Sequence, residues 1–441
     1  MKNPNTYSFI NPKKIPFFYG YVVLTFGSIG VLFSIPGQTV GVSVFTDPVK
    51  DALGLTRNQF SNAYMIGTLL SAFFVTKAGR LFDKFGARIV GFFAAFLLGL
   101  SLIVFSFSEK ISTSIQNLFS LETWIIPFIL LCFLFFFIRF CGQGVLTMSS
   151  RNMIMMWFDK NRGKVNSISS IAISLGFSSS PIFINYLIDA NGWEMSWQIL
   201  ALCLLIFSFL VLQFYRNKPE DFGMLPDGCK GDIKEKSINK STEININLKQ
   251  AKKTRAFWMF GAALAFSSFL ITGFTFHVIS IFESNAFTRE EAISVFLPIS
   301  LIAITVSTIA NILSDYITHK IYLYLMIFSG ILATYGLLIL ENSSGIYFLI
   351  AGLGMYSGLF AVVNAVTWPR YYGRKFLGEI TGKVASFLVI ASAIAPSLFS
   401  YCFTTFGDYK FISYLLLPFL IFMFFAAFKV QNPQVNLSNL K

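Results

Sequence analysis

Three ionisable side chains lie inside long apolar stretches of the sequence, where a charged group is costly and is therefore a functional candidate by default. They are Arg139, His277 and Lys383. Arginine and lysine can hold a carboxylate through charge-assisted hydrogen bonds, and histidine can gain or lose a proton near neutral pH. No aspartate or glutamate lies deep in any of these stretches. The pattern favours a neutral-to-positive site for an anion, with His277 as the candidate for carrying a proton.

Other polar residues in the apolar stretches could add contacts to the same anion. Gln143 follows Arg139 by four residues, and Gln38 falls on His277 when the two halves of the chain are aligned with a shift of 239 residues. The remaining candidates come from one stretch just before a proline and are Asn364, Thr367 and Trp368.

Each candidate also has a purely structural interpretation. Arg139 could hydrogen-bond to helix backbone, and His277 could be a buried imidazole with satisfied partners. Lys383 follows Glu379 by four residues, a spacing that forms ion pairs on a helix. Gln143 could pack beside neighbouring glycines, and the polar residues before the proline could simply end their helix. The residues alone leave both interpretations open.

The chain around these candidates is unusually apolar. Hydrophobic residues make up 55% of its 441 residues and charged residues 12%, about half the charged fraction of a soluble domain. Stretches such as FILLCFLFFF are apolar on every face, which favours helices over the alternating strands of a membrane barrel. We therefore predict an all-α polytopic membrane protein with twelve transmembrane helices. They are expected near residues 18–44, 58–77, 88–107, 124–150, 165–189, 195–215, 256–283, 291–314, 320–340, 345–369, 377–402 and 409–429.

One long polar interval divides these helices six plus six. It is rich in Lys, Asn, Asp and Gly and poor in aromatic residues, which is typical of a flexible linker. We predict an N-terminal six-helix bundle over 1–215, a cytoplasmic linker over 216–255, a C-terminal six-helix bundle over 256–429 and a cytoplasmic tail over 430–441.

Lysine and arginine are distributed asymmetrically along the chain. With both termini placed in the cytoplasm, 27 of the 34 fall in cytoplasmic segments and 5 in outer loops. This strong positive-inside signal sets the predicted orientation. It also accounts for the net charge of +13 without nucleic acid, because the charges face the anionic inner leaflet. The predicted location is a plasma membrane, specifically a bacterial inner membrane.

The ten residues GRLFDKFGAR, Gly79 to Arg88, join the second and third predicted helices on the cytoplasmic side. They resemble the signature of the major facilitator superfamily between these helices. A shift of 232 residues lays them on an eroded copy, NILSDYITHK, in which Asp315 matches Asp83 but Asn311 replaces the first glycine. The residues expected to form this gating motif are Gly79, Leu81, Asp83, Lys84, Gly86, Arg88 and Asp315.

Two further stretches resemble the same superfamily. RFCGQG resembles the R-x-x-x-G motif of its fourth helix, and SLGFSSSP resembles the motif of its fifth helix. More narrowly, WFDKNRGK, NKPEDFGMLPDG and WPRYYGRKFLG resemble the branch of oxalate/formate antiporters and monocarboxylate porters. The glycines and prolines expected to shape helix packing are Gly142, Gly144, Gly176, Pro181 and Pro396.

The resemblance implies two pseudo-symmetric six-helix bundles that expose a substrate to each side in turn. It implies that the first and seventh helices line the cavity, which brings in Gln38 and His277. In the family, the arginine matched by Arg139 is often assigned to proton coupling or to the substrate. Asp83 could lie against the N-terminal dipole of another helix or pair with a base such as Arg88, and so latch the two halves on the inside. The alternative is a solvated turn that only sets topology.

These observations predict a secondary transporter of a small organic anion, a mono- or dicarboxylate, coupled to protons or to exchange. We expect it to act as a monomer in the lipid bilayer. No nucleotide-binding, catalytic or metal-site pattern occurs, so we expect no enzyme activity, cofactor or metal, and five free cysteines. Two alternatives stay open. One is efflux of amphipathic or drug-like compounds, suggested by the Phe-rich helices, and the other is a non-transporting sensor that signals through the linker.

Overall fold

The computed structural model describes residues 11–120, 123–228 and 245–434, and the described regular elements are all helical. Helices suit these apolar stretches because they satisfy their own backbone hydrogen bonds. In the N-terminal half they are α1 (Gly20–Phe33), α2 (Thr39–Val44), α3 (Thr46–Ala52), α4 (Arg57–Ser106), α5 (Ser108–Phe119), α6 (Ile125–Ile138), the π-helical stretch Arg139–Leu146, α7 (Thr147–Trp157) and α8 (Arg162–Phe214). In the C-terminal half they are α10 (Leu248–Ala251), α11 (Arg255–Glu283), α12 (Arg289–Ser294), α13 (Phe296–Leu313), α14 (His319–Leu338), α15 (Ser343–Tyr372), α16 (Leu377–Phe406) and α17 (Lys410–Ala427).

The described helices account for the predicted membrane spans. Nine of them are long and apolar enough to cross a membrane, and α1 is a shorter apolar helix. Two of the nine, α4 and α8, are each two spans joined at a glycine, with φ of 81° at Gly86 and 80° at Gly192. Glycine adopts this conformation readily because it has no Cβ. Counting these divisions, the helices match the twelve predicted spans and confirm the all-helical membrane fold.

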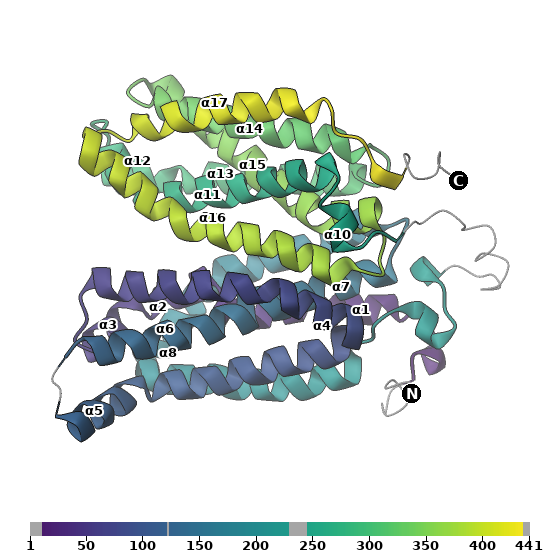
Figure 1. The fold of residues 1–441 in the computed structure, drawn as a ribbon, viewed down its shortest axis with the longest axis horizontal. Helices are drawn as coiled ribbons and strands as arrows, with labels where there is room; N and C mark the ends of the chain where they lie inside the picture. Colours follow the sequence, from purple (N-terminus) through teal and green to yellow (C-terminus); the bar gives the residue numbers. More distant parts are fainter. Residues whose placement is uncertain (1–10, 121–122, 229–244, 435–441) are drawn as a thin grey trace. The chain divides into compact units, whose positions relative to one another are not determined.

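Packing divides the chain into two compact units. In the first, α4 packs against α6, and α1 packs against α7; in the second, α15 packs against α13 and α14, and α17 packs against α14 (Figure 1). The units comprise residues 1–159, 172–241 and 377–386, and residues 160–171, 242–376 and 387–441. The first turns of α8 and of α16 are therefore each grouped with helices from the other half of the sequence. The predicted bundle boundaries do not include this exchange. Each of the two helix starts is also capped by an aspartate, as described below.

Both described ends of the predicted linker are packed. Arg216 is fully buried, and burial lowers the pKa of its guanidinium. Ile246 is buried as well. The described ends, 216–228 and 245–255, thus carry side chains that pack into the two units, and the flexible linker stays a prediction. Residues 229–244 lie outside the described residues.

Helix α5 differs from the sequence prediction, which leaves residues 108–123 between two spans. Its first turns bury Ser108 and Ser112, and it packs against α6, while Leu118 and Phe119 at its end are exposed. Helix α5 is too short and too polar to cross a membrane. Its helical structure therefore depends on its packing against α6.

Candidate functional site

Arg139 is a buried guanidinium at the start of the π-helical stretch. It is 2% exposed, and its Nη1 donates to the Gly37 carbonyl at 3.1 Å. The guanidinium carbon stands 5.1 Å from the centroid of the Tyr64 ring. Its Nε has no hydrogen-bond partner, and no carboxylate pairs with it among the described residues. A buried cation without a counter-charge is energetically costly.

The backbone that reaches Arg139 is the turn between α1 and α2, which touches the π-helical stretch at two glycines. A Cβ on Gly37 would lie 2.3 Å from the Ile138 carbonyl oxygen and 2.8 Å from the Cα of Gly142. Neither position could therefore carry a side chain without moving the backbone. This close approach brings the Gly37 carbonyl within reach of Arg139.

A polar cluster adjoins this contact. Gln38 Nε2 donates to Ser34 Oγ and to Thr147 Oγ1, each at 3.0 Å, and the hydroxyls of Thr147 and Ser34 lie 2.9 Å apart. Gln143 has a buried Oε1 that finds no hydrogen-bond partner among the residues that the structure describes. The structure thus brings Gln38 beside Arg139. Sequence reasoning missed Thr147 and Ser34, although Thr147 continues the four-residue spacing that begins at Arg139 and Gln143.

His277 lies in the second unit, on α11. Its Nε2 is 2.9 Å from the Pro396 carbonyl oxygen, and its Nδ1 is 3.4 Å from the Tyr409 hydroxyl. A carbonyl only accepts, so Nε2 carries the proton of the neutral ring and Nδ1 is the free base. The Tyr409 hydroxyl also lies 3.0 Å from Ser280 Oγ, and its single proton serves either this oxygen or Nδ1 at any one time. Proton uptake at Nδ1 would turn it into a donor facing Tyr409, which changes this small network.

The remaining predicted substrate contacts differ in their surroundings. Lys383 is half-buried on the part of α16 that belongs to the first unit, and Asn364 is half-buried on α15. Trp368 is fully buried and packs against Phe257 and Tyr372, and its Nε1 has no hydrogen-bond partner in the part of the chain that the structure describes. Its ring belongs to the aromatic core of the second unit, and a contact between Trp368 and substrate stays a prediction.

The predicted helix-packing residues lie at close contacts or inside helices. A Cβ on Gly144 would lie 2.9 Å from the Val75 side chain, and a Cβ on Gly176 would lie 2.3 Å from that of Leu32. Pro181 stands inside α8 and Pro396 inside α16. The carbonyl of Pro396 is the one that His277 contacts.

Asp83 caps the beginning of α16. Its Oδ1 accepts from the Gly378 amide at 2.7 Å and its Oδ2 from the Glu379 amide at 2.8 Å. The first amides of a helix have no partner within it and carry the positive end of its dipole, so a carboxylate is stabilised there. Gly79 allows the approach, because a Cβ on it would lie 2.0 Å from the Gly378 carbonyl oxygen. We call this contact the Asp83 cap.

Arg88 is not the partner of Asp83, which corrects one of the two expected arrangements. Its Nε donates to the Leu212 carbonyl at 2.7 Å, and its amide donates to the Asn217 side chain at 3.3 Å. Gly86 ends the first span of α4 beside the same Asn217. The other motif residues, Leu81 and Lys84, are exposed.

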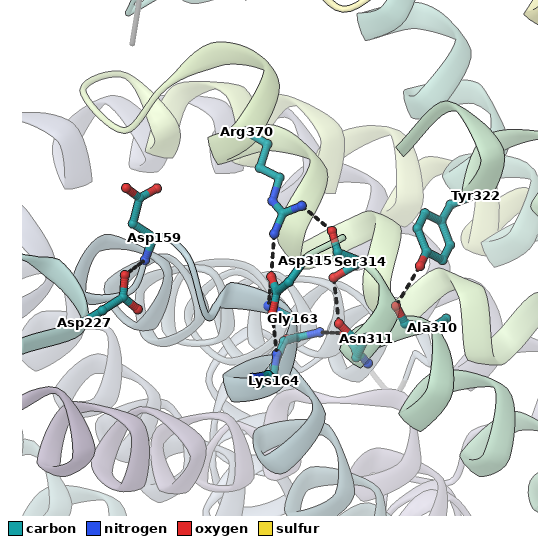
Figure 2. Close-up of polar contacts among 11 residues, drawn as sticks. Asp159, Gly163, Lys164, Asp227, Ala310, Asn311, Ser314, Asp315, Tyr322 and Arg370 are labelled. Carbon is teal, nitrogen blue, oxygen red and sulfur yellow. Dashed lines mark hydrogen bonds and ion pairs between the residues drawn. The ribbon is translucent and has the colours of Figure 1, made fainter. Parts of the chain in front are cut away.

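Asp315 makes the matching contact at the beginning of α8, which we call the Asp315 cap. Its Oδ1 accepts from the Gly163 amide at 2.9 Å and its Oδ2 from the Lys164 amide at 3.1 Å (Figure 2). Arg370, from α15, adds an ion pair to Asp315 and a hydrogen bond to the Ser314 carbonyl. Sequence reasoning did not identify Arg370 as a partner.

In the second copy of the motif, Asn311 replaces the first glycine and makes a specific contact. Asn311 is fully buried, and its Oδ1 accepts from Asn166 Nδ2 at 2.6 Å. A Cβ on Gly163 would lie 1.9 Å from the Asn311 carbonyl oxygen. Gly163, in the first turn of α8, therefore allows α8 to approach α13 closely. Asn311 adds a side-chain hydrogen bond that a glycine could not make.

Comparison with known protein families agrees with this arrangement. The profile of the Major Facilitator Superfamily matches residues 17–396. The chain belongs to the major facilitator superfamily. As a member of this superfamily it is a multi-pass membrane transporter.

Solved structures of superfamily members share the fold. The proton:xylose symporter XylE, bound to 6-bromo-6-deoxy-D-glucose, is similar with a TM-score of 0.66 and 16% identity over 93% of this chain and 94% of that chain. The E. coli fucose:proton symporter FucP has a TM-score of 0.61 and 14% identity over 94% and 99% of the two chains. The human organic anion transporter MFSD10 has a TM-score of 0.58 and 14% identity over 94% and 100%. At these identities the likeness concerns the fold.

Proposed function

We propose that this transporter carries a small organic anion, a mono- or dicarboxylate, by alternating access driven by a proton gradient or by exchange. The observation that supports the proposal is the buried guanidinium of Arg139, which has no carboxylate partner among the described residues. A bound carboxylate would provide the missing counter-charge and would accept a charge-assisted hydrogen bond.

The polar cluster beside Arg139 suits the same ligand. Gln38 and Thr147 have donor groups that could exchange their present partners for a carboxylate oxygen. The Tyr64 ring already covers one side of the guanidinium, which leaves its edge for the ligand. Arg139 would bind the carboxylate, and the neighbouring amide and hydroxyl would orient it.

His277 is our candidate for coupling to protons. Its Nδ1 is the basic nitrogen of the neutral ring and faces the Tyr409 hydroxyl. Its Nε2 is anchored on the Pro396 carbonyl of α16. Protonation at Nδ1 would reverse the direction of the hydrogen bond to Tyr409, and would thereby couple proton uptake to the packing of α11 against α16 and α17.

The two aspartate caps are our candidates for the cytoplasmic gate. While they are formed, the start of α16 is held to α4 through Asp83, and the start of α8 is held to α13 through Asp315. We infer that opening toward the cytoplasm breaks both caps and leaves the helix-start amides to water. A net cost of about 1–3 kcal/mol for each charged hydrogen bond is enough to bias such an equilibrium.

The structural neighbours are described with different substrates, so their descriptions do not identify the substrate of this chain. MFSD10 is described as an organic anion transporter, whereas XylE and FucP are described as sugar:proton symporters. The narrower resemblance of WFDKNRGK and WPRYYGRKFLG to oxalate/formate antiporters and monocarboxylate porters supports the anion. Arg139 supports it more directly, because a neutral sugar would leave the buried charge uncompensated.

Uptake by proteoliposomes tests the proposal. Labelled formate, lactate, oxalate and succinate would be compared with labelled xylose and fucose, each with and without an inward proton gradient. We expect saturable uptake of at least one carboxylate and none of the sugars. Transport of a sugar with no carboxylate moving or competing would overturn the anion proposal. Exchange would be identified by uptake that requires carboxylate inside the proteoliposomes but no proton gradient.

A further inference from the structure

A second arginine, Arg151 of α7, lies on the same continuous helical span as Arg139, Ile125–Trp157. Its Nε is buried without a hydrogen-bond partner, and no ion pair or hydrogen bond to its side chain is found among the described residues. The residue as a whole is only part-buried. The Nε of Arg151 is therefore shielded from water and donates no hydrogen bond to any described residue.

The two arginines belong to one polar stripe. Arg139, Gln143, Thr147 and Arg151 follow each other at intervals of four residues. Residues four apart lie on the same face of an α-helix. A π-helix has more residues in each turn, so four residues are also close to one full turn in the π-helical stretch. Sequence reasoning identified the first two members and did not extend the stripe to Arg151.

The other faces of α7 are occupied by neighbouring helices. Ser149 Oγ donates to the Ala87 carbonyl of α4 at 3.3 Å, and Asn152 Nδ2 donates to Thr381 Oγ1 of α16 at 2.7 Å. The Ser150 hydroxyl lies 2.7 Å from the Tyr215 hydroxyl. Each of these residues anchors α7 to a different segment. Arg151 follows Thr147 by four residues and so starts from the helix face that the two residues share.

We propose that Arg151 is a second binding station for the carboxylate substrate, on the cytoplasmic side of the Arg139 station. The proposal rests on the proposed function, because it assigns a second contact to the same anion. Arg151 stands twelve positions after Arg139, which corresponds to a rise of roughly 18 Å along the helix. A dicarboxylate of two to four carbons cannot span that distance. The stations are therefore occupied in succession, Arg139 first from outside and Arg151 before release inside.

The chemistry of the station is that of a guanidinium with free donors. A planar carboxylate can accept two parallel hydrogen bonds from Arg151, a geometry that lysine cannot reproduce. The Arg151 end of the stripe leads toward Trp157, the end of α7, which the charge distribution places on the cytoplasmic side. An anion arriving from the cytoplasm would meet Arg151 before it meets Arg139.

The test measures uptake from each side separately, in right-side-out and inside-out membrane vesicles, with the best carboxylate found for the wild type. For Arg151→Gln we expect KM measured from the cytoplasmic face to rise about tenfold, which corresponds to about 1.4 kcal/mol. KM measured from the outer face should stay within about twofold of wild type, because the Arg139 station is intact. Lys77→Gln, which removes an exposed charge that lies over the Phe74 ring of its own helix, is the matched control and should leave both values unchanged.

A conservative variant protects the test against misfolding. Arg151→Lys keeps the positive charge but cannot donate two parallel hydrogen bonds to a carboxylate. We therefore expect KM measured from the cytoplasmic face to rise about threefold, with no change from the outer face. Equal KM changes on both faces, or no change on either, would overturn the second station. That result would leave the proposed function standing if the wild type still moves the carboxylate. Absence of carboxylate transport by the wild type would overturn both.

Discussion

The carboxylate of Asp83 accepts a hydrogen bond from the backbone amide of Gly378 at 2.7 Å, across 295 residues of sequence. The same carboxylate accepts from the next amide, that of Glu379, at 2.8 Å. Asp83 lies between the two spans of α4, and Gly378 lies in the first turn of α16. One side chain thus joins two distant helices through the unpaired amides at a helix start.

Replacing Asp83 tests whether this joint is a gate. In Asp83→Asn one side-chain oxygen can still accept, but the amide nitrogen then faces a backbone donor, and the charge that complements the helix dipole is gone. We expect the initial rate of carboxylate uptake to fall about tenfold or more, with normal amounts of protein in the membrane. Lys77→Gln, at an exposed position of the same helix outside the motif, is the control and should transport normally. Unchanged uptake by Asp83→Asn would remove the gating role.

Replacing Gly79 tests the close approach without touching a charge. The Cβ of Gly79→Ala would lie 2.0 Å from the Gly378 carbonyl oxygen, so the helices must separate. We expect faster labelling, from the cytoplasmic side, of a cysteine introduced by Ser386→Cys, because Ser386 is buried and its hydroxyl donates to the Ala72 carbonyl of α4.

The matched control for this variant is Gly261→Ala, where the nearest atom to a Cβ is a ring carbon at 3.4 Å. It should leave the labelling rate of the introduced cysteine unchanged. Equal labelling rates in Gly79→Ala and in the parent protein would contradict the account of α4 and α16 as a closed pair.

Replacing His277 separates proton coupling from substrate binding. In His277→Gln the side-chain amide can still donate to the Pro396 carbonyl, but it cannot take up a proton as Nδ1 can. We expect exchange of labelled for unlabelled carboxylate to continue, while accumulation driven by a proton gradient is lost. Gradient-driven accumulation at the wild-type level in His277→Gln would exclude His277 as the proton carrier.

The fold follows from local sequence features. The apolar stretches and the lysine and arginine asymmetry predict the spans, and the turns at Gly86 and Gly192 appear where the apolar pattern breaks. The duplicated motif also placed Asp315 opposite Asp83 in the repeat. These signals are local or periodic, so a single sequence contains them. Helix α5 was missed because it is short and polar, and it depends on packing against α6.

The partners within the site required the structure. Asp83 could have met a base or a helix dipole, and only the fold shows that the dipole of α16 is used, while Arg88 binds the Leu212 carbonyl instead. Trp368 lies in the same stretch as Asn364 and Thr367, and only the fold shows that the aromatic core of its unit encloses its ring. Its burial depends on Phe257, more than a hundred residues away, which local spacing does not reveal.

The central claim is that Arg139 binds the carboxylate of the substrate. The most direct measurement is the KM and maximal rate of carboxylate uptake by proteoliposomes containing wild type, Arg139→Lys or Arg139→Gln, at matched protein content. The account predicts saturable uptake by the wild type, a KM raised about tenfold in Arg139→Lys, where the second hydrogen bond of the fork is lost, and no uptake above background in Arg139→Gln. Uptake by Arg139→Gln with the KM and rate of the wild type would contradict it.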